Sequence, residues 1–359
     1  MRTVNILSDN PRWKDRSILF FLYKWNSDFL KAGIKLNFFY DHHKFLEASA
    51  DEGIILSRYF SEWQNIQKRS GANHDALVTY LGKAKKVYNR IFWFDVSDGT
   101  GSTDFSIIKY VDVFLKKQVL KNRHYYTEDH GRKSVRIWLQ DTGENINTNF
   151  DYYDPCPPEE LHKIRIAWNL GMCDYRYFPH YTRVLSNYWL GNPTVKEPGM
   201  GKEIDISFRG NASYDKTNLI SFQRNKVFEC LPGLNGQVIA GGIVSRKQYL
   251  DEIGKSKICI SPFGWGEICY RDFEAFLYGC VLVKPTVDYM DTFPNVFFGD
   301  KTYISTSLDM SDIRQRIQYT IDNYPMLKEI AVNGQNEYLK YITDKNHLVD
   351  HFTAMIATN

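Results

Sequence analysis

The sequence predicts an α/β protein with two doubly wound parallel-sheet domains that face a cleft, followed by C-terminal helices. Two series of short apolar runs alternate with helical patterns, which is typical of parallel sheets covered by helices. A segment rich in proline and glycine separates the two series. With 359 residues, the chain is long enough for two domains that each bury a core.

The first series begins at the N-terminus. We expect strands at 3–8, 35–40, 53–57, 90–95 and 111–115. Helices are expected at about 16–32 and 60–69, with a short one after residue 40. Gly33 follows the first helix, as a C′ glycine does. A connection rich in Asp, Asn, Pro and Tyr follows at about 140–160.

The second series follows the segment 187–202, which is the best linker candidate because of its glycines and prolines. We expect strands at 204–208 and 237–240, helices at 217–230 and 245–254, and then a continuous unit at 258–285. The pattern from about 311 to 356 is helical. The predicted domains are therefore 1–187 and 203–340, and we expect a terminal helix at 341–359 that can pack back on the first domain.

Composition gives few signs of a macromolecular partner. The net charge is +3 and 24% of residues are charged, so the chain as a whole shows no commitment to nucleic acid or an anionic membrane. Six cysteines have no CxxC spacing, and we expect reduced core residues rather than zinc ligands or disulfides. No apolar run approaches the ~20 residues of a membrane span, so we expect a soluble cytoplasmic protein, with peripheral membrane contact left open.

The unit at 258–285 carries the strongest functional signal. It reads as a strand, a glycine loop, a helix from about Glu267 to Tyr278, and a second strand. Glycines let the backbone approach a ligand closely, and the free N–H groups of a helix start favour phosphate. On a helical wheel Glu267, Arg271 and Glu274 share one stripe. The pattern therefore predicts a nucleotide or phosphate site.

The residues SPFGWGEICYRDFEAFLYGCVLVKP resemble the C-terminal nucleotide-sugar site of GT-B-fold glycosyltransferases, in the form seen in family-1-like and exostosin-like enzymes. DISFRGNASYD at 205–215 looks like the opening strand and loop of the same domain. The resemblance implies a hexosyl- or pentosyltransferase, as in polysaccharide biosynthesis, with Glu274 accepting from the donor ribose. Glu267 and Glu274 are one residue closer than the Glu-x7-Glu of many retaining members, so inversion is slightly preferred.

Donor binding by such an enzyme requires positive charge near the diphosphate that leaves. The sequence has no Asp-x-Asp tripeptide to hold a divalent metal, so we expect no metal and no cofactor besides the nucleotide-sugar co-substrate. Cations and backbone N–H groups take that role. The candidate donor-binding residues are Arg209, Gly264, Trp265, Gly266, Glu267, Arg271, Glu274 and Lys284. The alternatives are an ion-pair ladder on the helix for Glu267, Arg271 and Glu274, and an ordinary solvated lysine for Lys284.

An inverting transferase also needs a base beside the acceptor hydroxyl. The aromatic strand IFWFDVSDG ends in Asp95 and Asp98, and Asp9 follows the first strand. Asp98 is the first choice, Asp95 the second, and Asp9 a further candidate. The alternative is that these aspartates are helix caps or turn residues. The histidines have no spacing that marks a metal site.

Other functions remain open from the sequence alone. A sugar-nucleotide epimerase would react without an acceptor, and a non-catalytic nucleotide- or glycan-binding protein would bind without turnover. A saccharide or glycan acceptor is preferred, and nucleic acid is less favoured but not excluded. Nucleic acid would use the basic stretch Lys116, Lys117, Lys121, Arg123, Arg132 and Lys133. A dehydrogenase is disfavoured because no G-x-G-x-x-G opens the first domain, and the sequence does not indicate an oligomeric state.

Overall fold

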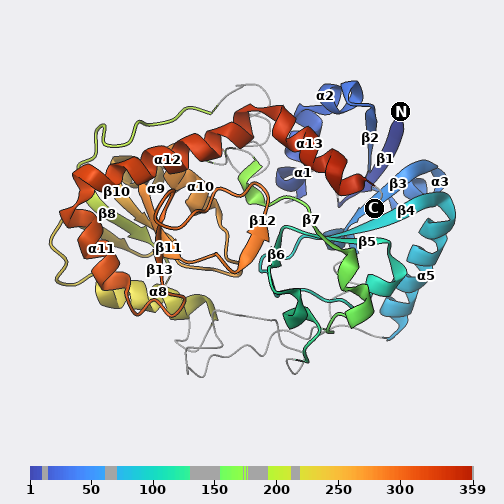
Figure 1. Cartoon of the computed structure of the whole chain (residues 1–359), viewed down its shortest axis with the longest axis horizontal. Helices are drawn as coiled ribbons and strands as arrows, with labels where there is room; N and C mark the ends of the chain where they lie inside the picture. Colours follow the sequence, from blue (N-terminus) through green and yellow to red (C-terminus); the bar gives the residue numbers. More distant parts are fainter. Residues whose placement is uncertain are drawn as a thin grey trace.

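The computed structural model describes residues 1–9, 15–60, 71–129, 154–172, 174, 176, 193–211 and 219–357. These residues form two parallel sheets and a set of C-terminal helices, which confirms the predicted fold class (Figure 1). The N-terminal half lies on the right of Figure 1, and α12 (Tyr324–Thr343) and α13 (Lys345–Ile356) run from the second half back toward the first.

The first sheet has six parallel strands in the order β2-β1-β3-β4-β5-β7. Their bounds are Arg2–Leu7 for β1, Ile34–Phe39 for β2, Ala50–Leu56 for β3, Tyr88–Asp95 for β4, Val113–Lys116 for β5 and Ile164–Ile166 for β7. β2 pairs with one edge of β1 and β3 pairs with the other, so the order of strands reverses at β1 and creates a switch point. Ligands of doubly wound sheets bind near such a switch point, outside the carboxyl ends of the strands.

Helices cover both faces of this sheet. In β4, Phe92 and Phe94 pack on one side of the sheet, and Ile91 and Trp93 pack on the other. Apolar side chains thus alternate between the two faces, so both faces must be covered by helices. α1 (Asp15–Lys24), α2 (Asn26–Lys31) and α13 lie on the first side, and Gly33 follows α2 with a φ of +81°, as predicted.

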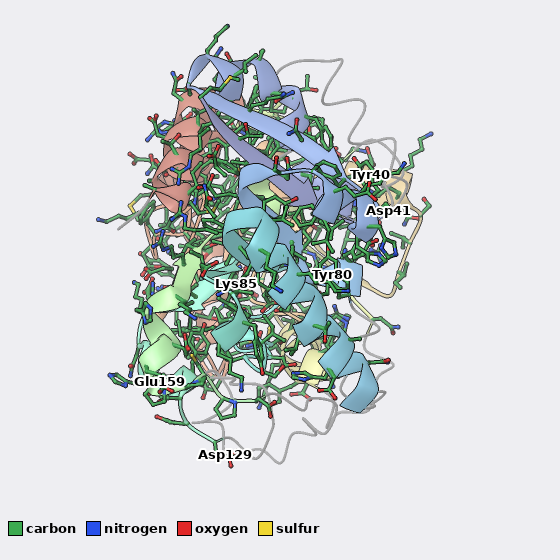
Figure 2. The ribbon with its side chains drawn as sticks, turned by 90° about the vertical axis from the view of Figure 1, so that its right-hand side faces the viewer. Tyr40, Asp41, Tyr80, Lys85, Asp129 and Glu159 are labelled. Carbon is green, nitrogen blue, oxygen red and sulfur yellow. The ribbon has the colours of Figure 1, made fainter. Side chains whose placement is uncertain are left out.

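The opposite face is covered by α3 (His42–Glu47) and α5 (Gly71–Val87). Figure 2 looks onto this face, where α5 runs diagonally across and carries Tyr80 and Lys85. The hydroxyl of Tyr80 donates to the carbonyl of His42 at 3.0 Å, and the Asp41 carboxylate accepts from two N–H groups at the start of α3. The short helix α3 is thus fixed both by its cap and by α5.

The second sheet has five parallel strands in the order β13-β11-β10-β8-β9, with its switch point between β8 and β10. The strands are β8 Ile204–Arg209, β9 Val238–Gly241, β10 Ser256–Ile260, β11 Val281–Pro285 and β13 Ile304–Thr306. The helices are α8 Leu219–Cys230, α9 Arg246–Lys255, α10 Tyr270–Leu277, α11 Ile313–Asp322 and the long α12. One layer of this core contains residues of α10 and α12, and the other contains residues of α8 and α11.

Two structures join the halves. The short antiparallel ribbon of β6 (Gln118–Leu120) and β12 (Met290–Thr292) takes one strand from each half. In addition, α13 packs on the first sheet, where Phe352 stacks near Trp168, and Arg90 and Arg165 donate to the carbonyls at the end of the helix. These contacts hold the carboxyl edges of the two sheets near each other.

Several elements differ from the sequence prediction. Residues 57–60 form a 3₁₀ turn and residues 61–70 lie outside the described part of the chain, while the long α5 at Gly71–Val87 was not predicted. Residues 187–192 of the predicted linker at 187–202, and residues 140–153 of the connection at 140–160, also lie outside it. The helix expected to start near Glu267 begins at Tyr270, because Asp272 accepts from the N–H of Cys269 and closes a cap there.

The five cysteines in the described residues are free thiols, and four of them are buried, as expected of small core residues. No helix in the described ranges is long and apolar enough to cross a bilayer.

Candidate active site

The glycine loop of the second half touches the loop that follows β4 in the first half. Gly266 is buried, and a Cβ atom there would overlap the backbone carbonyl of Asp98. Beside this contact, the N–H and hydroxyl of Thr100 donate to the two oxygens of the Glu267 carboxylate at 2.9 and 2.7 Å. The two loops therefore meet directly, and only glycine fits where their backbones are closest.

Asp98 presents its side chain to solvent at this junction. The carboxylate is 52% exposed, and the ammonium of Lys117, which is 2% exposed, donates to Oδ1 at 2.9 Å. The side-chain amide of Gln118 donates to the Asp98 carbonyl, so both the backbone and the carboxylate have fixed partners. This combination of an exposed carboxylate on a fixed backbone is suitable for contact with a substrate.

Asp95, the second predicted base, has a different environment. It is buried, and its oxygens accept from the ammonium of Lys116 at 2.9 Å and from the N–H and hydroxyl of Ser97, each at 3.0 Å. Burial alone would raise the pKa of Asp95, but the charge of Lys116 and these hydrogen bonds outweigh it and lower the pKa. The carboxylate is thus a buried ion-pair partner that holds the end of β4.

Asp9, the third candidate, comes two residues after the end of β1, at the switch point of the first sheet. It is partly buried, and its carbonyl accepts from the hydroxyl of Ser8 at 3.3 Å. Residues 10–14 lie outside the described ranges. The structure therefore places Asp9 at the same edge of the sheet as Asp98, although on a different strand.

On the donor side, Glu274 lies on α10 with both carboxylate oxygens engaged. The guanidinium of Arg246 donates to Oε1 at 2.5 Å and the hydroxyl of Tyr249 donates to Oε2 at 2.7 Å. Burial, and then the neighbouring Glu274 carboxylate, raise the pKa of Tyr249 well above its usual value, so the phenol stays protonated. Each carboxylate oxygen keeps a second lone pair, but the Glu274 side chain is 4% exposed, so a ligand hydroxyl reaches it only if Arg246, which is 40% exposed, moves aside.

The two predicted arginines lie at the carboxyl edge of the second sheet. Arg209, at the end of β8, makes a two-pronged ion pair with Glu252 at 2.7 and 2.6 Å. Arg271 donates to the carbonyls of Arg209 and Ile260 at 2.5 and 3.4 Å. The alternative reading, an ion-pair ladder along α10, is not what the structure shows, because Glu274 pairs with Arg246 and Glu267 lies before the helix.

The glycine loop offers fewer N–H donors than expected. The N–H of Gly264 donates to the Gly266 carbonyl at 3.1 Å, so it closes the loop. Within the described residues, the N–H groups of Trp265 and Gly266 have no recorded acceptor. The Trp265 side chain is 54% exposed, which is uncommon for a tryptophan away from a binding surface.

Two predicted donor-binding residues are inside the protein instead. Lys284 was expected at the sheet edge, but its side chain is fully buried and donates to Asp272 at 2.7 Å and to the Glu267 carbonyl at 2.8 Å. Its role is therefore structural. Glu267 is likewise buried and is bound to Thr100, so it joins the two halves rather than facing a ligand.

Three residues of the basic stretch that nucleic acid would use are engaged within the protein. Lys116 and Lys117 are buried against Asp95 and Asp98, and Arg123 donates to the Ile164 carbonyl. Arg132 and Lys133 lie outside the described ranges. In the part of the chain that the structure describes, no group of three His, Cys, Asp or Glu residues is arranged to hold a metal ion.

Sequence reasoning missed several residues that shape the site. Arg246 and Tyr249 bind Glu274 although they lie 28 and 25 residues before it in the sequence. Thr100 binds Glu267, which lies 167 residues later. Lys117 was noted only as part of the basic stretch. No local pattern gives these partners, although the serine before Arg246 does indicate a helix start, and it caps α9.

No protein-family model matches the chain, and no curated protein matches it. Among solved structures, the chain is similar to an alpha-glucosyltransferase in complex with UDP, at 12% identity and a TM-score of 0.49, over 99% of this chain and 100% of that one. It is also similar to the T4 phage beta-glucosyltransferase, at 12% identity and a TM-score of 0.45, over 100% of both chains. A third is Anabaena HepE in complex with UDP-glucose, at 10% identity and a TM-score of 0.46, over 99% of both chains.

Proposed function

We propose that the chain is a glycosyltransferase that moves a sugar from a nucleotide-sugar donor to a hydroxyl of a saccharide or related acceptor, with inversion and without a metal. One observation carries this proposal. The backbone carbonyl of Asp98, at the edge of the first sheet, packs against Gly266 of the glycine loop at the edge of the second, and the Asp98 carboxylate is 52% exposed next to this contact. A base and a phosphate-binding loop are thus side by side.

The donor occupies the carboxyl edge of the second sheet in this proposal. The ribose hydroxyls donate to Glu274, which is buried behind Arg246 and Tyr249, so the ligand must displace the half-exposed Arg246 to reach it. The diphosphate lies near the glycine loop, where the N–H groups of Trp265 and Gly266 and the guanidinium of Arg271 stabilise the charge that develops as it leaves. Arg209 can contribute only if the ligand displaces Glu252.

The acceptor hydroxyl lies next to Asp98. Asp98 takes the hydroxyl proton while the oxygen forms a bond to the anomeric carbon, and the bond from that carbon to the diphosphate breaks with its electron pair on the phosphate oxygen. Lys117 holds the Asp98 carboxylate in place through the ion pair at 2.9 Å. Since attack and departure occur on opposite faces, the product has inverted configuration.

The identity of the donor base is tested by calorimetric titration with UDP, GDP, CDP, dTDP, ADP and CMP in the presence of a chelator. We expect one nucleotide to bind tightly, and Glu274→Gln to weaken it about 10-fold or more, because a neutral amide accepts less strongly from ribose. Glu329→Gln, at an exposed position of α12, is the matched control and should change nothing.

Binding that requires metal would contradict the metal-independent part of the proposal. An epimerase would convert its nucleotide sugar without an acceptor, and a binding protein would leave the donor intact over hours. An acceptor panel of saccharides and DNA then separates the preferred acceptor class from nucleic acid.

A further inference from the structure

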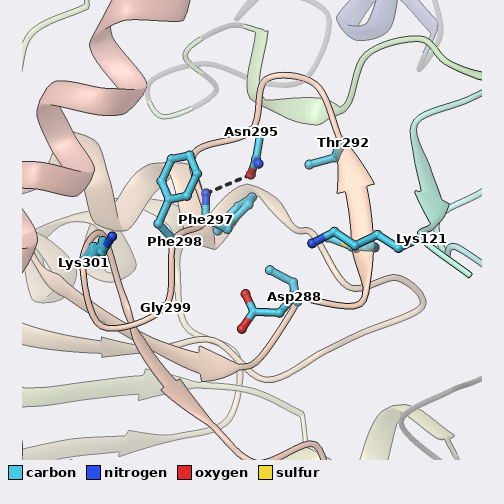
Figure 3. A pocket seen from close by; sticks show the side chains of 10 residues that line it. Lys121, Asp288, Thr292, Asn295, Phe297, Phe298, Gly299 and Lys301 are labelled. Atoms are coloured by element: carbon cyan, nitrogen blue, oxygen red, sulfur yellow. Dashed lines mark hydrogen bonds between the residues drawn. The ribbon is translucent and has the colours of Figure 1, made fainter.

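A second pocket lies at the junction of the two halves, beside the ribbon of β6 and β12. It has a volume of about 260 Å³. Figure 3 shows it enclosed by the residue after β6, the residues that lead into and out of β12, and the loop near 298–301. The lining includes Lys121, Asp288, Asn295, Phe297, Phe298 and Lys301.

Thr292 in the wall of this pocket is bonded within the protein, since its hydroxyl accepts from the Asn169 amide at 2.8 Å and donates to the Lys117 carbonyl at 2.9 Å. Lys121 and Lys301 are exposed, and no carboxylate in the described part of the chain lies within 4.0 Å of either ammonium. The Asn295 carbonyl oxygen accepts from the N–H of Phe297 at 3.4 Å, which leaves its amide N–H groups without a recorded protein acceptor. The Asp288 carboxylate likewise has no recorded side-chain donor.

These groups match the chemistry of one class of ligand. Two ammonium groups and an amide supply donors for the three oxygens of a phosphate. An acidic side chain would repel a bare anion, but it accepts well from sugar hydroxyls. The Phe298 ring is 40% exposed and gives an apolar surface for the C–H face of a sugar ring. The volume is that of a small ligand rather than a polymer segment.

We propose that this pocket binds a phosphorylated monosaccharide, with the phosphate held by Lys121, Lys301 and Asn295 and the hydroxyls by Asp288. The pocket is distinct from the Asp98 site. Lys121 follows Gln118 by three residues, a backbone separation of roughly 10 Å, and Gln118 is the residue that holds the Asp98 carbonyl. Binding here does not depend on the transfer reaction.

The test is titration of the full chain with glucose 6-phosphate and glucose 1-phosphate, followed by calorimetry or NMR, with glucose, inorganic phosphate and glucuronate as comparisons. We expect a sugar phosphate to bind more tightly than all three. Lys121→Ala and Lys301→Ala should each weaken it about 10-fold through loss of a charged hydrogen bond. Lys83→Ala, on the exposed side of α5, is the matched control and should have no effect.

Asp288→Asn gives the sharpest distinction. We expect it to strengthen binding of inorganic phosphate and to remove the preference for the sugar phosphate, because the repulsive charge and the hydroxyl acceptor are lost together. The proposal is overturned if no sugar phosphate binds up to about 10 mM, where even a weak site is filled. It is also overturned if glucuronate binds equally well, or if Lys121→Ala and Lys301→Ala bind like the wild type. The nucleotide panel with Glu274→Gln tests the transferase proposal, and the sugar-phosphate titrations test this pocket. A negative result in one measurement therefore does not affect the other proposal.

Discussion

At the scale of single residues, two aspartates that lie three positions apart have different environments. Asp95 is buried with Lys116, whereas Asp98 is half exposed with Lys117. The sequence gives an aromatic strand that ends in two acids, and it predicts that one of them faces a ligand. The sequence alone does not show which of the two aspartates faces the ligand. Their burial depends on the lysines that pair with them, and these lie at the end of β5 and directly after it.

Lys117→Met tests whether the buried ammonium of Lys117 supports turnover by holding the Asp98 carboxylate in place. We expect turnover to fall about 10-fold with unchanged nucleotide affinity, because the carboxylate loses its fixed cation. A lysine with a purely structural role would lower the thermal midpoint and leave the turnover of the folded enzyme unchanged.

At the scale of elements, the sequence of the unit at 258–285 predicts the order of its strands and helix but not the residue at which the helix begins. The strand, loop, helix and strand were all predicted in order, because apolar periodicity and glycine spacing are local signals. The helix start was misplaced by three residues, so Glu267 was assigned to the ligand face when it bonds to Thr100 in the other half. Lys284 was likewise expected at an edge but is buried under that loop.

The two glycines of the loop provide a matched pair of variants. In Gly266→Ala the new methyl group would overlap the Asp98 carbonyl, whereas a Cβ at Gly264 meets no atom within 4 Å. We expect Gly266→Ala to reduce the free energy of unfolding by about 1–3 kcal/mol and to reduce turnover, since the loops must move apart. Gly264→Ala should be nearly neutral. Equal effects of the two variants on thermal unfolding and turnover would argue against a close interdomain contact.

At the scale of the whole molecule, helix α13 and the long loop after β12 tie the halves together around His351. Its ring stacks on Phe293 at 3.8 Å, and its Nε2 lies 2.5 Å from the carbonyl of Ala167. These contacts connect residues far apart in the sequence, and the composition and periodicity of the chain gave no sign of them. The two-sheet architecture itself was predicted, because it follows from repeated local patterns.

His351 should make the stability of this junction depend on pH. Burial lowers the pKa of His351 below its usual value near 6.5, so the unfolded chain binds a proton more readily. Stability from this group is present above about pH 6.5 and decreases as the pH falls below it. We expect the thermal midpoint to fall between pH 7 and pH 5 less steeply in His351→Gln than in the wild type.

His347→Gln is the control for that measurement, because His347 is on the same helix but half exposed near Asp344. It should keep the wild-type slope. If His351→Gln also keeps that slope, the histidine does not couple protonation to the docking of α13.

In the proposed function, Asp98 and the glycine loop of the second sheet form one transfer site. The most direct measurement is turnover of the nucleotide sugar whose base the titrations identify, compared between wild type, Asp98→Asn and the exposed control Asp75→Asn on α5. We predict that Asp98→Asn lowers turnover about 100-fold or more while nucleotide affinity is unchanged, and that Asp75→Asn behaves as the wild type. Wild-type turnover by Asp98→Asn would contradict the claim.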